Sequence, residues 1–184
     1  MQQGALIAIV GPSGVGKDTV MAALMEQCSS LGLVQRDITR PCDPMGENHV
    51  PRSKQEFQQL VREGQYIMTW HAHGLDYGIS KQAIEPLNSG QSLLINLSRN
   101  VLIDARSIFP NFYVINLIAD RDTLAHRLTA RGRETREDIK SRLARQSAPL
   151  DPRLKAITVD NSGSINTTVS SICAVLSLPI KDPL

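Results

Sequence analysis

The chain carries near its start the stretch Gly11-Pro12-Ser13-Gly14-Val15-Gly16-Lys17-Asp18-Thr19, and this stretch decides the fold. An apolar run at residues 5–10 precedes it, and apolar residues at Val20 and Leu24 follow it at helical spacing. A strand, a glycine-rich turn and a helix in this order are the context of a phosphate-binding P-loop. The glycines let backbone N–H groups point inward at phosphate oxygens, and the helix N-terminus adds partial positive charge. We therefore predict that residues 11–19 bind the phosphates of ATP, with Lys17 reaching the β- and γ-phosphates.

One position departs from the usual P-loop pattern. That pattern follows the lysine with Ser or Thr, whose hydroxyl ligates magnesium, whereas here Asp18 follows Lys17 and Thr19 comes next. A carboxylate is a hard oxygen donor, so Asp18 is a candidate magnesium ligand together with Thr19. An acidic residue in the first turn also stabilises a helix through its dipole, and the sequence leaves both roles open for Asp18.

Length and composition limit the class of protein. The 184 residues are enough for one sizeable domain and too few for two. The net charge of only +2 gives no general footprint of nucleic-acid or membrane binding, and the apolar runs have the length of strands. With no basic flank before a long apolar region, we expect no signal peptide, a cytoplasmic location and no nucleic-acid or membrane partner, and a homodimer is left open. Cys28 and Cys173 fall in apolar helical stretches, which favours buried thiols.

Strands and helices alternate along the chain. Apolar runs predict strands at residues 5–10, 33–38, 66–70, 92–97, 112–119 and 156–159. Spacing and capping residues predict a helix after the P-loop, one that opens at Thr135, and others at 53–64, 80–90, 101–108, 120–132 and 165–176. This alternation predicts a single α/β domain whose parallel sheet is covered by helices on both faces. Residues 36–80 are expected to form an irregular insertion that binds substrate, with a loop at 71–78, between core segments at 1–35 and 81–184.

Local signals assign structural roles to a few side chains. Ser53 and Glu56 form the pattern of a capping box, and Gly64 is expected to close the helix that they open. Asp120 is expected to cap the N-terminus of the helix predicted at 120–132, which carries Leu124 and Leu128. His126 lies on an amphipathic helix and is expected to be structural.

Three further motifs, taken in their order along the chain, make it resemble the guanylate kinases. Thr39-Arg40 resembles that family's acceptor-phosphate arginine, and Gly74-Leu75-Asp76-Tyr77-Gly78 matches its Gly-x-x-Tyr-Gly loop. A segment resembling the family's lid runs from Arg127 through Arg131-Gly132-Arg133-Glu134-Thr135 to Arg142. The resemblance covers nearly the whole chain. It implies a P-loop kinase fold with a small acceptor-binding insertion and an arginine-bearing lid at about residues 129–138.

The residues with which guanylate kinases read guanine are replaced. Met68 stands at the position of the base-reading carboxylate, and the neighbourhood of a second one is Asn96-Leu97-Ser98-Arg99. The N1–H and amino groups of guanine are donors, and a buried donor without an acceptor costs roughly 1–3 kcal/mol. Asp43 replaces a second acceptor arginine, and His49 stands in place of a phosphate-binding tyrosine. The sequence thus keeps the phosphotransfer machinery and lacks the base pocket.

These departures resemble another branch of the same superfamily, the ribose 1,5-bisphosphate phosphokinases of phosphonate catabolism. The Lys17-Asp18 pair is typical of this branch. So are the segments Ile38-Thr39-Arg40, Glu47-Asn48-His49, Trp70-His71-Ala72-His73-Gly74, Asn96 with Ser98-Arg99, and Gly132-Arg133-Glu134. The resemblance implies transfer of the γ-phosphoryl group of ATP to the 1-phosphate of ribose 1,5-bisphosphate. The products would be 5-phospho-α-D-ribosyl 1-diphosphate, the compound abbreviated PRPP, and ADP.

The resemblance also implies a set of site residues. The acceptor of that reaction is an ionised phosphate oxygen, so no general base is needed and catalysis rests on positioning and on cations. Lys17, Arg131 and Arg142 are expected to be catalytic, with ATP held by residues 11–19 and Mg²⁺ by Asp18 and Thr19. The acceptor, a phosphorylated sugar, is expected to contact Arg40, His49, His71, His73, Tyr77, Gly78, Asn96, Arg99 and Arg133.

Alternatives stay open at this point. A guanylate or other nucleoside-monophosphate kinase would have to read its base without a carboxylate at position 68. A non-catalytic guanylate-kinase-like module that binds a protein partner would usually lack the P-loop lysine or the lid arginines, which this chain retains. His71 and His73 are also a candidate zinc pair, and Trp70 belongs either to the core or to the wall of a sugar pocket. Asp160-Asn161 lies where the superfamily contacts adenine.

Overall fold

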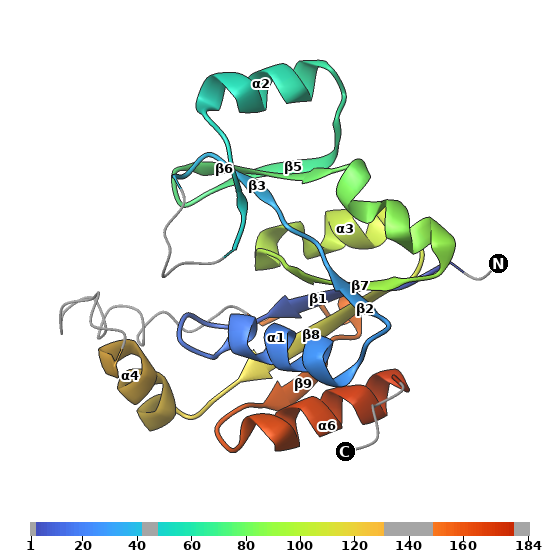
Figure 1. Cartoon of the computed structure of the whole chain (residues 1–184). Coiled ribbons are helices and arrows are strands. Elements are labelled where there is room, and N and C mark those ends of the chain that lie inside the picture. The colour runs from blue at the N-terminus through green and yellow to red at the C-terminus, as the bar shows by residue number, and fades with distance from the viewer. Residues whose placement is uncertain (1–2, 42–47, 131–148, 179–184) are drawn as a thin grey trace.

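The main sheet of the protein is parallel. The computed structural model describes residues 3–41, 48–130 and 149–178, and within them this sheet has five strands in the order β2-β7-β1-β8-β9 (Figure 1). The strands are β1 (Leu6–Val10), β2 (Leu31–Leu33), β7 (Ser92–Asn96), β8 (Phe112–Ile118) and β9 (Ile157–Asp160). All four pairings between them are parallel. The predicted α/β fold with a parallel sheet is confirmed.

Helices cover both faces of this sheet. Side chains alternate between the two faces along a strand, so both faces carry apolar side chains that the helices bury. Ile7 and Ile9 of β1 pack into one buried cluster with residues of α1 and α6, whereas Leu6, Ala8 and Val10 pack into another with residues of η1 and α3. The bounds of these helices are α1 (Lys17–Gln27), η1 (Gln82–Ser89), α3 (Leu102–Ile108) and α6 (Ile165–Leu176). The central strand is thus buried on both sides, as its unbroken apolar run requires.

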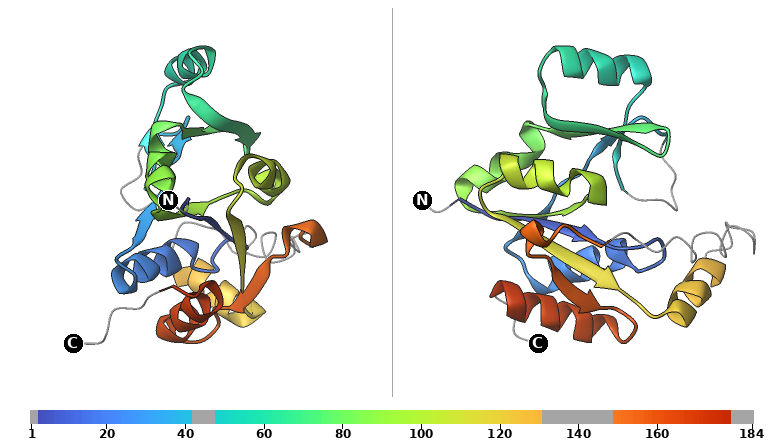
Figure 2. Two further views of the ribbon diagram at one scale, coloured as in Figure 1. Left: turned by 90° about the vertical axis from the view of Figure 1, so that its right-hand side faces the viewer. Right: turned by 180° about the vertical axis from the view of Figure 1, so that it is seen from behind.

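A smaller mixed sheet lies at one end of the molecule, opposite α6 (Figure 2). Its strands run in the order β4-β3-β6-β5, with β3 parallel to β4 and antiparallel to β6. Their bounds are β3 (Asp37–Ile38), β4 (Val50–Pro51), β5 (Tyr66–Ala72) and β6 (Leu75–Ser80), and α2 (Lys54–Arg62) covers the outer face of the sheet. Phe57 of α2 stacks on Tyr66 of β5, with ring centroids 4.9 Å apart.

Two predictions about this region were wrong. The single strand expected at residues 33–38 is two strands in different sheets, because the chain leaves the main sheet after Val34, whose N–H still donates to Leu94 of β7. The loop expected at 71–78 is the turn and second strand of a hairpin. Ala72 pairs with Leu75, so the turn consists only of His73 and Gly74, with φ angles of 53° and 76°.

The predicted caps are confirmed. The hydroxyl of Ser53 accepts from the Glu56 N–H at 3.1 Å, and the Glu56 carboxylate accepts from the Ser53 N–H at 2.7 Å. Asp120 accepts from the N–H of Thr123 at 2.7 Å at the start of α4 (Arg121–Ala130). This bond, with a second from the Thr123 hydroxyl, lowers the pKa of Asp120 to about 2.

Smaller differences concern the ends and type of the helices. The segment predicted as a helix at 80–90 is the 3₁₀-helix η1, which contains Pro86 and so lacks one backbone donor. Two further 3₁₀ turns are η2 (Arg99–Val101) and η3 (Pro152–Leu154). The helix predicted from Thr135 lies outside the described residues. Cys28 and Cys173 are buried with their sulfurs 3.3 Å apart, as expected for core thiols. No helix in the described segments is long and apolar enough to cross a membrane.

Candidate active site

The P-loop folds around Lys17, the first residue of α1. The Lys17 Nζ donates to the carbonyl oxygens of Gly11 at 3.0 Å and Pro12 at 3.2 Å. Gly14 and Gly16 have φ angles of 84° and 93°, in the left-handed region that favours glycine. The curled backbone and the placement of the lysine at a helix N-terminus are those that a phosphate site requires.

Side chains from two segments that are distant in the sequence donate hydrogen bonds to the backbone of the P-loop. The carbonyl oxygen of Val15 accepts from Asn161 Nδ2 at 2.7 Å and from Arg127 Nη1 at 3.2 Å. The Asn161 Oδ1 in turn accepts from the hydroxyl of Thr168 at 2.7 Å, and both residues are buried. A β-carbon on Gly16 would lie only 2.9 Å from Asn161 Nδ2, so the loop and its support fit closely. The sequence pointed only to the neighbourhood of Asn161, as an adenine contact, and gave Arg127 no role of its own.

One hollow opens beside the P-loop, toward α4 and α6. Its volume is about 400 Å³. It is lined by Gly14, Gly16, Thr19, His126, Arg127, Ala130, Asn161 and Ile165. His126, which we expected to be a structural residue, is exposed and belongs to this lining. Helical spacing alone could not distinguish a ring that faces this hollow from one that packs on the core. We call this space the donor-side hollow.

A second cavity, of about 480 Å³, lies on the other side of α1, at the carboxyl ends of β2 and β7. Its lining residues are Asp18, Met21, Ala22, Met25, Leu33, Val34, Asn48 and Asn96. We call it the acceptor-side cavity, because Asn48 belongs to the insertion at residues 36–80. Asp18 lines this cavity and Thr19 lines the donor-side hollow, since successive helical residues point about 100° apart. The two candidate magnesium ligands thus face different sides of the helix start.

The inner face of the insertion is aromatic. Trp70 and Tyr77 stack with ring centroids 5.2 Å apart and planes 7° from parallel. The Trp70 Nε1 donates to the Ser98 hydroxyl at 3.1 Å, which ties this face to the loop after β7. Trp70 is therefore both packed on the core and part of the wall between insertion and sheet. The guanidinium of Arg36 lies over both rings, and no motif in the sequence had singled this residue out.

Arg40 and His49 lie together, as the resemblance implied. A ring nitrogen of His49 lies 3.1 Å from the carbonyl oxygen of Arg40, and the His49 side chain is buried. The imidazole thus positions the backbone that carries Arg40. The Arg40 Nε is buried and, among the described residues, has no hydrogen-bond partner. Because an unpaired buried N–H is costly, this guanidinium is suited to an anionic ligand.

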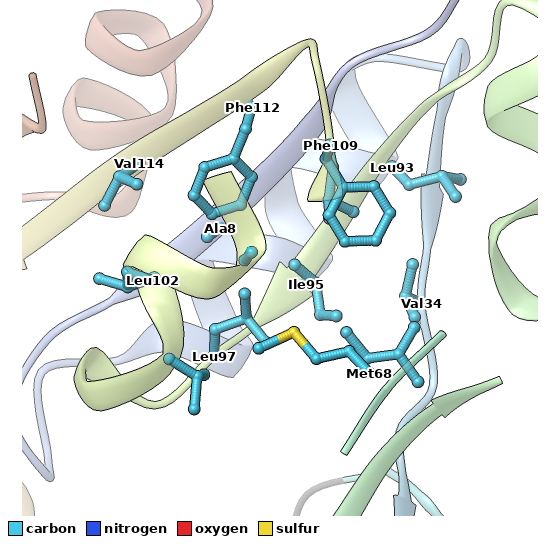
Figure 3. Close-up of a cluster of buried hydrophobic side chains, with 14 of the residues drawn as sticks. Ala8, Val34, Met68, Leu93, Ile95, Leu97, Leu102, Phe109, Phe112 and Val114 are labelled. Carbon is cyan, nitrogen blue, oxygen red and sulfur yellow. The ribbon is translucent and has the colours of Figure 1, made fainter. Parts of the chain in front are cut away.

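Met68 occupies the position at which guanylate kinases carry a carboxylate. It is 7% exposed and packs in the buried cluster that includes Val34, Ile95 and Leu97 (Figure 3). A thioether in this cluster cannot accept the strong hydrogen bonds that guanine requires. The structure therefore places an apolar core contact where that family reads its base.

Other expected acceptor residues are placed more peripherally. His71 pairs through Nδ1 with Asp76 at 2.7 Å, and its side chain is 65% exposed. His73 is an exposed turn residue, and among the described residues no group of three or more metal-ligating side chains is assembled, so the zinc interpretation gains no third ligand there. Gly78 has a packing reason to be glycine, because a β-carbon there would meet the Tyr66 ring at 2.6 Å.

Asn96 and Arg99 lie at the carboxyl edge of the main sheet. Asn96 ends β7 and lines the acceptor-side cavity. Arg99 donates from Nη2 to the Asn116 Oδ1 at 2.8 Å, and burial lowers the pKa of its guanidinium. The three expected lid and catalytic arginines, Arg131, Arg133 and Arg142, lie outside the described residues.

A buried carboxylate fixes the outer half of the insertion. Asp37 accepts from Arg52 Nε at 2.6 Å and from the Tyr66 hydroxyl at 2.8 Å. Burial, and then the bond to Asp37, raises the pKa of Tyr66 well above its usual value. The bond to Asp37 likewise raises the pKa of Arg52.

The fold and the site define a P-loop kinase of the guanylate-kinase-like class. In shape the chain is similar to the crystal structure of guanylate kinase from Anaplasma phagocytophilum, with a TM-score of 0.69 over 96% of this chain and 86% of that one. At 18% sequence identity this likeness concerns the fold alone. A family model described as an AAA domain matches residues 7–146, and the chain belongs to that family.

Comparison with the sequences of known proteins identifies the family more specifically. The chain is 42% identical over 176 residues to ribose 1,5-bisphosphate phosphokinase PhnN from Ruegeria sp. (strain TM1040), and the aligned region covers 95% of this chain and 92% of that protein. It is 42% identical over 174 residues to ribose 1,5-bisphosphate phosphokinase PhnN from Agrobacterium fabrum (strain C58 / ATCC 33970), covering 93% and 95%. The chain belongs to the ribose 1,5-bisphosphate phosphokinase family.

Proposed function

We propose that this protein transfers the γ-phosphoryl group of ATP to the 1-phosphate of ribose 1,5-bisphosphate. The products are ADP and 5-phospho-α-D-ribosyl 1-diphosphate, and the reaction serves phosphonate catabolism. The observation that carries the proposal is the contrast between two sides of one site. Lys17 sits in a fully formed P-loop, while the position that reads guanine in guanylate kinases is Met68 in an apolar cluster. Phosphoryl transfer is retained, and base recognition is not.

The donor nucleotide fits the donor-side hollow. We propose that the phosphates of ATP lie along residues 11–19 and that the adenosine lies in the hollow of about 400 Å³ between α4 and α6. Arg127, whose Nη1 donates to Val15, has a guanidinium at this hollow that can stack on a purine. His126 and Asn161 complete the polar part of the wall.

The acceptor needs orientation and charge neutralisation. Its attacking oxygen is already anionic at neutral pH, so no residue has to remove a proton, and repulsion between the two phosphates is the main barrier. Lys17 and the N–H groups of the P-loop stabilise the donor phosphates. Arg40, with its buried Nε, is proposed to hold the acceptor phosphate that attacks, and Asn96 and Arg99 to line its approach. The rings of Tyr77 and Trp70 form the wall behind them.

Magnesium suits the oxygen donors at the start of α1. The carboxylate of Asp18 and the hydroxyl of Thr19 are hard ligands of the kind that Mg²⁺ prefers. A Mg²⁺ ion held by these two residues together with ATP would supply charge neutralisation at the phosphates. Asp18 lines the acceptor-side cavity, so its carboxylate would hold the metal from the side of the proposed acceptor site.

The lid arginines and the remaining acceptor residues belong to the same proposal. Arg131 and Arg133, from a lid at about residues 129–138, and Arg142, from the segment that follows it, would act on the transferring group, and His71 and His73 would contact the sugar. Residues 36–80 would form the acceptor-binding part of a single domain. A cytoplasmic location agrees with the use of ATP, and light scattering tests for a homodimer.

The experiment is mass spectrometry of products. The protein is incubated with Mg-ATP and ribose 1,5-bisphosphate, and in a parallel tube with Mg-ATP and GMP, with the Lys17→Ala variant as the inactive control. We expect a phosphoribosyl diphosphate in the first tube and no GDP in the second. GDP formation without the sugar product would favour a nucleotide kinase. No product in either tube, with ATP binding intact, would favour a non-catalytic module.

A further inference from the structure

Asn116 is an amide in an otherwise aliphatic and aromatic strand. β8 has the sequence FYVINLI, and Phe112 and Val114, which pack on the α3 side of the sheet, belong to a buried cluster (Figure 3). Because side chains alternate along a strand, Asn116 lies on the same side as these two residues. A polar side chain at a core-facing position of a central strand departs from the local pattern, and such departures concentrate at functional sites.

The Asn116 amide holds the guanidinium of Arg99. The Arg99 Nη2 donates to the Asn116 Oδ1 at 2.8 Å, and the Asn116 Nδ2 donates to the hydroxyl of Thr158 on β9 at 3.3 Å. A guanidinium can only donate, so the amide must turn its oxygen toward Arg99, and the bond to Thr158 keeps it in that orientation. The three side chains form a chain of hydrogen bonds from the segment after β7 to β9.

This chain of hydrogen bonds crosses the end of the P-loop strand. β1 lies between β7 and β8 in the sheet, and Asn116 pairs with Val10, the last residue of β1. Arg99 therefore reaches across the end of β1, at the residue that precedes Gly11 and the rest of the P-loop. Parallel α/β sheets bind their ligands outside the carboxyl ends of the strands, so Arg99 lies at the edge where the donor phosphates bind.

The same short segment also contacts the insertion. Ser98, next to Arg99, accepts from Trp70 Nε1 at 3.1 Å, and Trp70 stacks on Tyr77 in the wall of the proposed acceptor site. Ser98 thus ties this segment to the acceptor side, while Arg99 ties it to the main sheet beside the P-loop. Arg99 stands at the junction of the two sides.

We propose that Arg99 stabilises the phosphoryl group during its transfer and that Asn116 is the positioning residue that holds Arg99 for this role. The proposal rests on the proposed function. In that reaction an oxygen of the acceptor 1-phosphate bonds to the γ-phosphorus of ATP, the bond from this phosphorus to the β-phosphate oxygen breaks, and ADP leaves with the electron pair. A cation fixed beforehand needs no reorganisation as the charge on these oxygens changes.

The choice of an amide at position 116 fits this role. Asp37 holds Arg52 with a carboxylate and so brings a negative charge to the guanidinium. Asn116 gives Arg99 a hydrogen bond of similar geometry and adds no negative charge that would repel a phosphate. An asparagine can therefore orient a cation at a phosphate site where an aspartate would oppose binding of the anion.

The central variant is Asn116→Asp, which keeps the shape of the side chain and an acceptor for Arg99 but adds a negative charge. We expect kcat to fall roughly 10- to 100-fold, the value of a charge-assisted hydrogen bond, while the KM values for ATP and ribose 1,5-bisphosphate change less than threefold. Tm should not fall, because the ion pair with Arg99 preserves the fold, so a merely structural asparagine would leave kcat unchanged. Asn100→Asp is the matched control. It adds the same charge on an exposed side chain beside Arg99, where solvent and salt screen it, and should change kcat less than about twofold.

A double-mutant cycle shows whether Asn116 acts through Arg99. In the background of Arg99→Met, Asn116→Asp should change kcat less than threefold, because the guanidinium that it neutralises is gone. Three results would overturn the proposal: an equal loss of kcat with and without the guanidinium, a raised KM for the acceptor at unchanged kcat, or unchanged kinetics.

A measurement without the acceptor separates this proposal from the proposed function. If the wild-type protein does not turn over ribose 1,5-bisphosphate, the proposed function fails, and thermal unfolding with Mg-ADP and aluminium fluoride then tests Arg99 alone, since the fluoride mimics the transferring group. The wild-type protein should gain more in Tm from this mixture than from Mg-ADP, and Asn116→Asp should lose that extra gain. An equal extra gain in both proteins would refute the role assigned to Asn116.

Discussion

Replacing Asn161 by alanine should loosen the P-loop without touching a phosphate-binding atom. The Asn161 amide donates to the Val15 carbonyl at 2.7 Å and accepts from the buried Thr168 hydroxyl at 2.7 Å. Its own N–H donates to Ile118 at 2.8 Å, a backbone bond that the substitution keeps. The change therefore removes the side-chain bridge between α6 and the loop and leaves the local backbone in place.

The magnitude follows from the two partners left behind. Each buried polar group that loses its partner costs roughly 1–3 kcal/mol. Val15 keeps the bond from Arg127, and the Thr168 hydroxyl can turn to the carbonyl oxygens of Asp160 at 3.3 Å or Ser164 at 3.4 Å, so the lower half of the range applies to both. We expect a loss of about 2–4 kcal/mol in the free energy of unfolding, or about 4–16 °C in Tm for a domain of this size.

The assay combines thermal unfolding with steady-state kinetics. Asn166→Ala, an exposed asparagine in the first turn of α6, is the matched control and should change the free energy of unfolding by less than about 0.5 kcal/mol. The KM for ATP should rise about fivefold in Asn161→Ala, which corresponds to roughly one hydrogen bond, while the KM for the acceptor stays near its original value. If Asn161→Ala melts within 1–2 °C of Asn166→Ala, or if the two KM values rise together, the support assigned to Asn161 is wrong.

Three other substitutions have distinct expected results. Lys17→Ala should lower kcat roughly a hundredfold or more because it removes the P-loop cation, and near-normal turnover would take the P-loop out of the mechanism. Asp120→Asn should lower Tm at neutral pH. Because the pKa of Asp120 in the folded protein is about 2, below the usual 3.8, the Tm difference from wild type should persist above pH 4 and vanish as the pH falls through 2. A Tm difference that survives at pH 2 would contradict this. Tyr66→Phe should cost about 1–2 kcal/mol through the lost bond to Asp37, whereas Tyr113→Phe on the exposed face of β8 should cost almost nothing; equal effects would refute the difference.

The main sheet was predictable because its strands are apolar runs buried on both faces. The path between the two sheets was not. Residues 33–38 contain no Gly or Pro that would mark the point where the chain leaves the main sheet, and the local sequence does not tell which sheet a strand joins. The hairpin turn was missed for a different reason. Its two residues, His73 and Gly74, both have positive φ angles, and the usual signal for such a turn is Asn-Gly or Asp-Gly.

The candidate site, like the fold, was predictable from the sequence only in part. The P-loop is a contiguous motif, so its role was readable from residues 11–19 alone. Its support by Arg127 and Asn161 joins residues 112 and 146 positions away from Val15, and spacing along the chain carries no trace of such contacts. Arg36 was overlooked because a lone arginine near a strand is ordinarily a surface residue. Only the stacked rings of Trp70 and Tyr77, seven residues apart across a hairpin, reveal its burial.

The most direct test of the central claim is ³¹P NMR of the reaction with [γ-¹⁸O]ATP and ribose 1,5-bisphosphate. The account predicts that ADP and a new sugar diphosphate appear together. The diphosphate of the sugar should give a coupled pair of doublets, while the phosphomonoester signal of its 5-phosphate stays unchanged. The ¹⁸O label should lie on the terminal phosphate of that diphosphate. ATP consumption that yields only inorganic phosphate, or label attached to the 5-phosphate, would contradict transfer to the 1-phosphate.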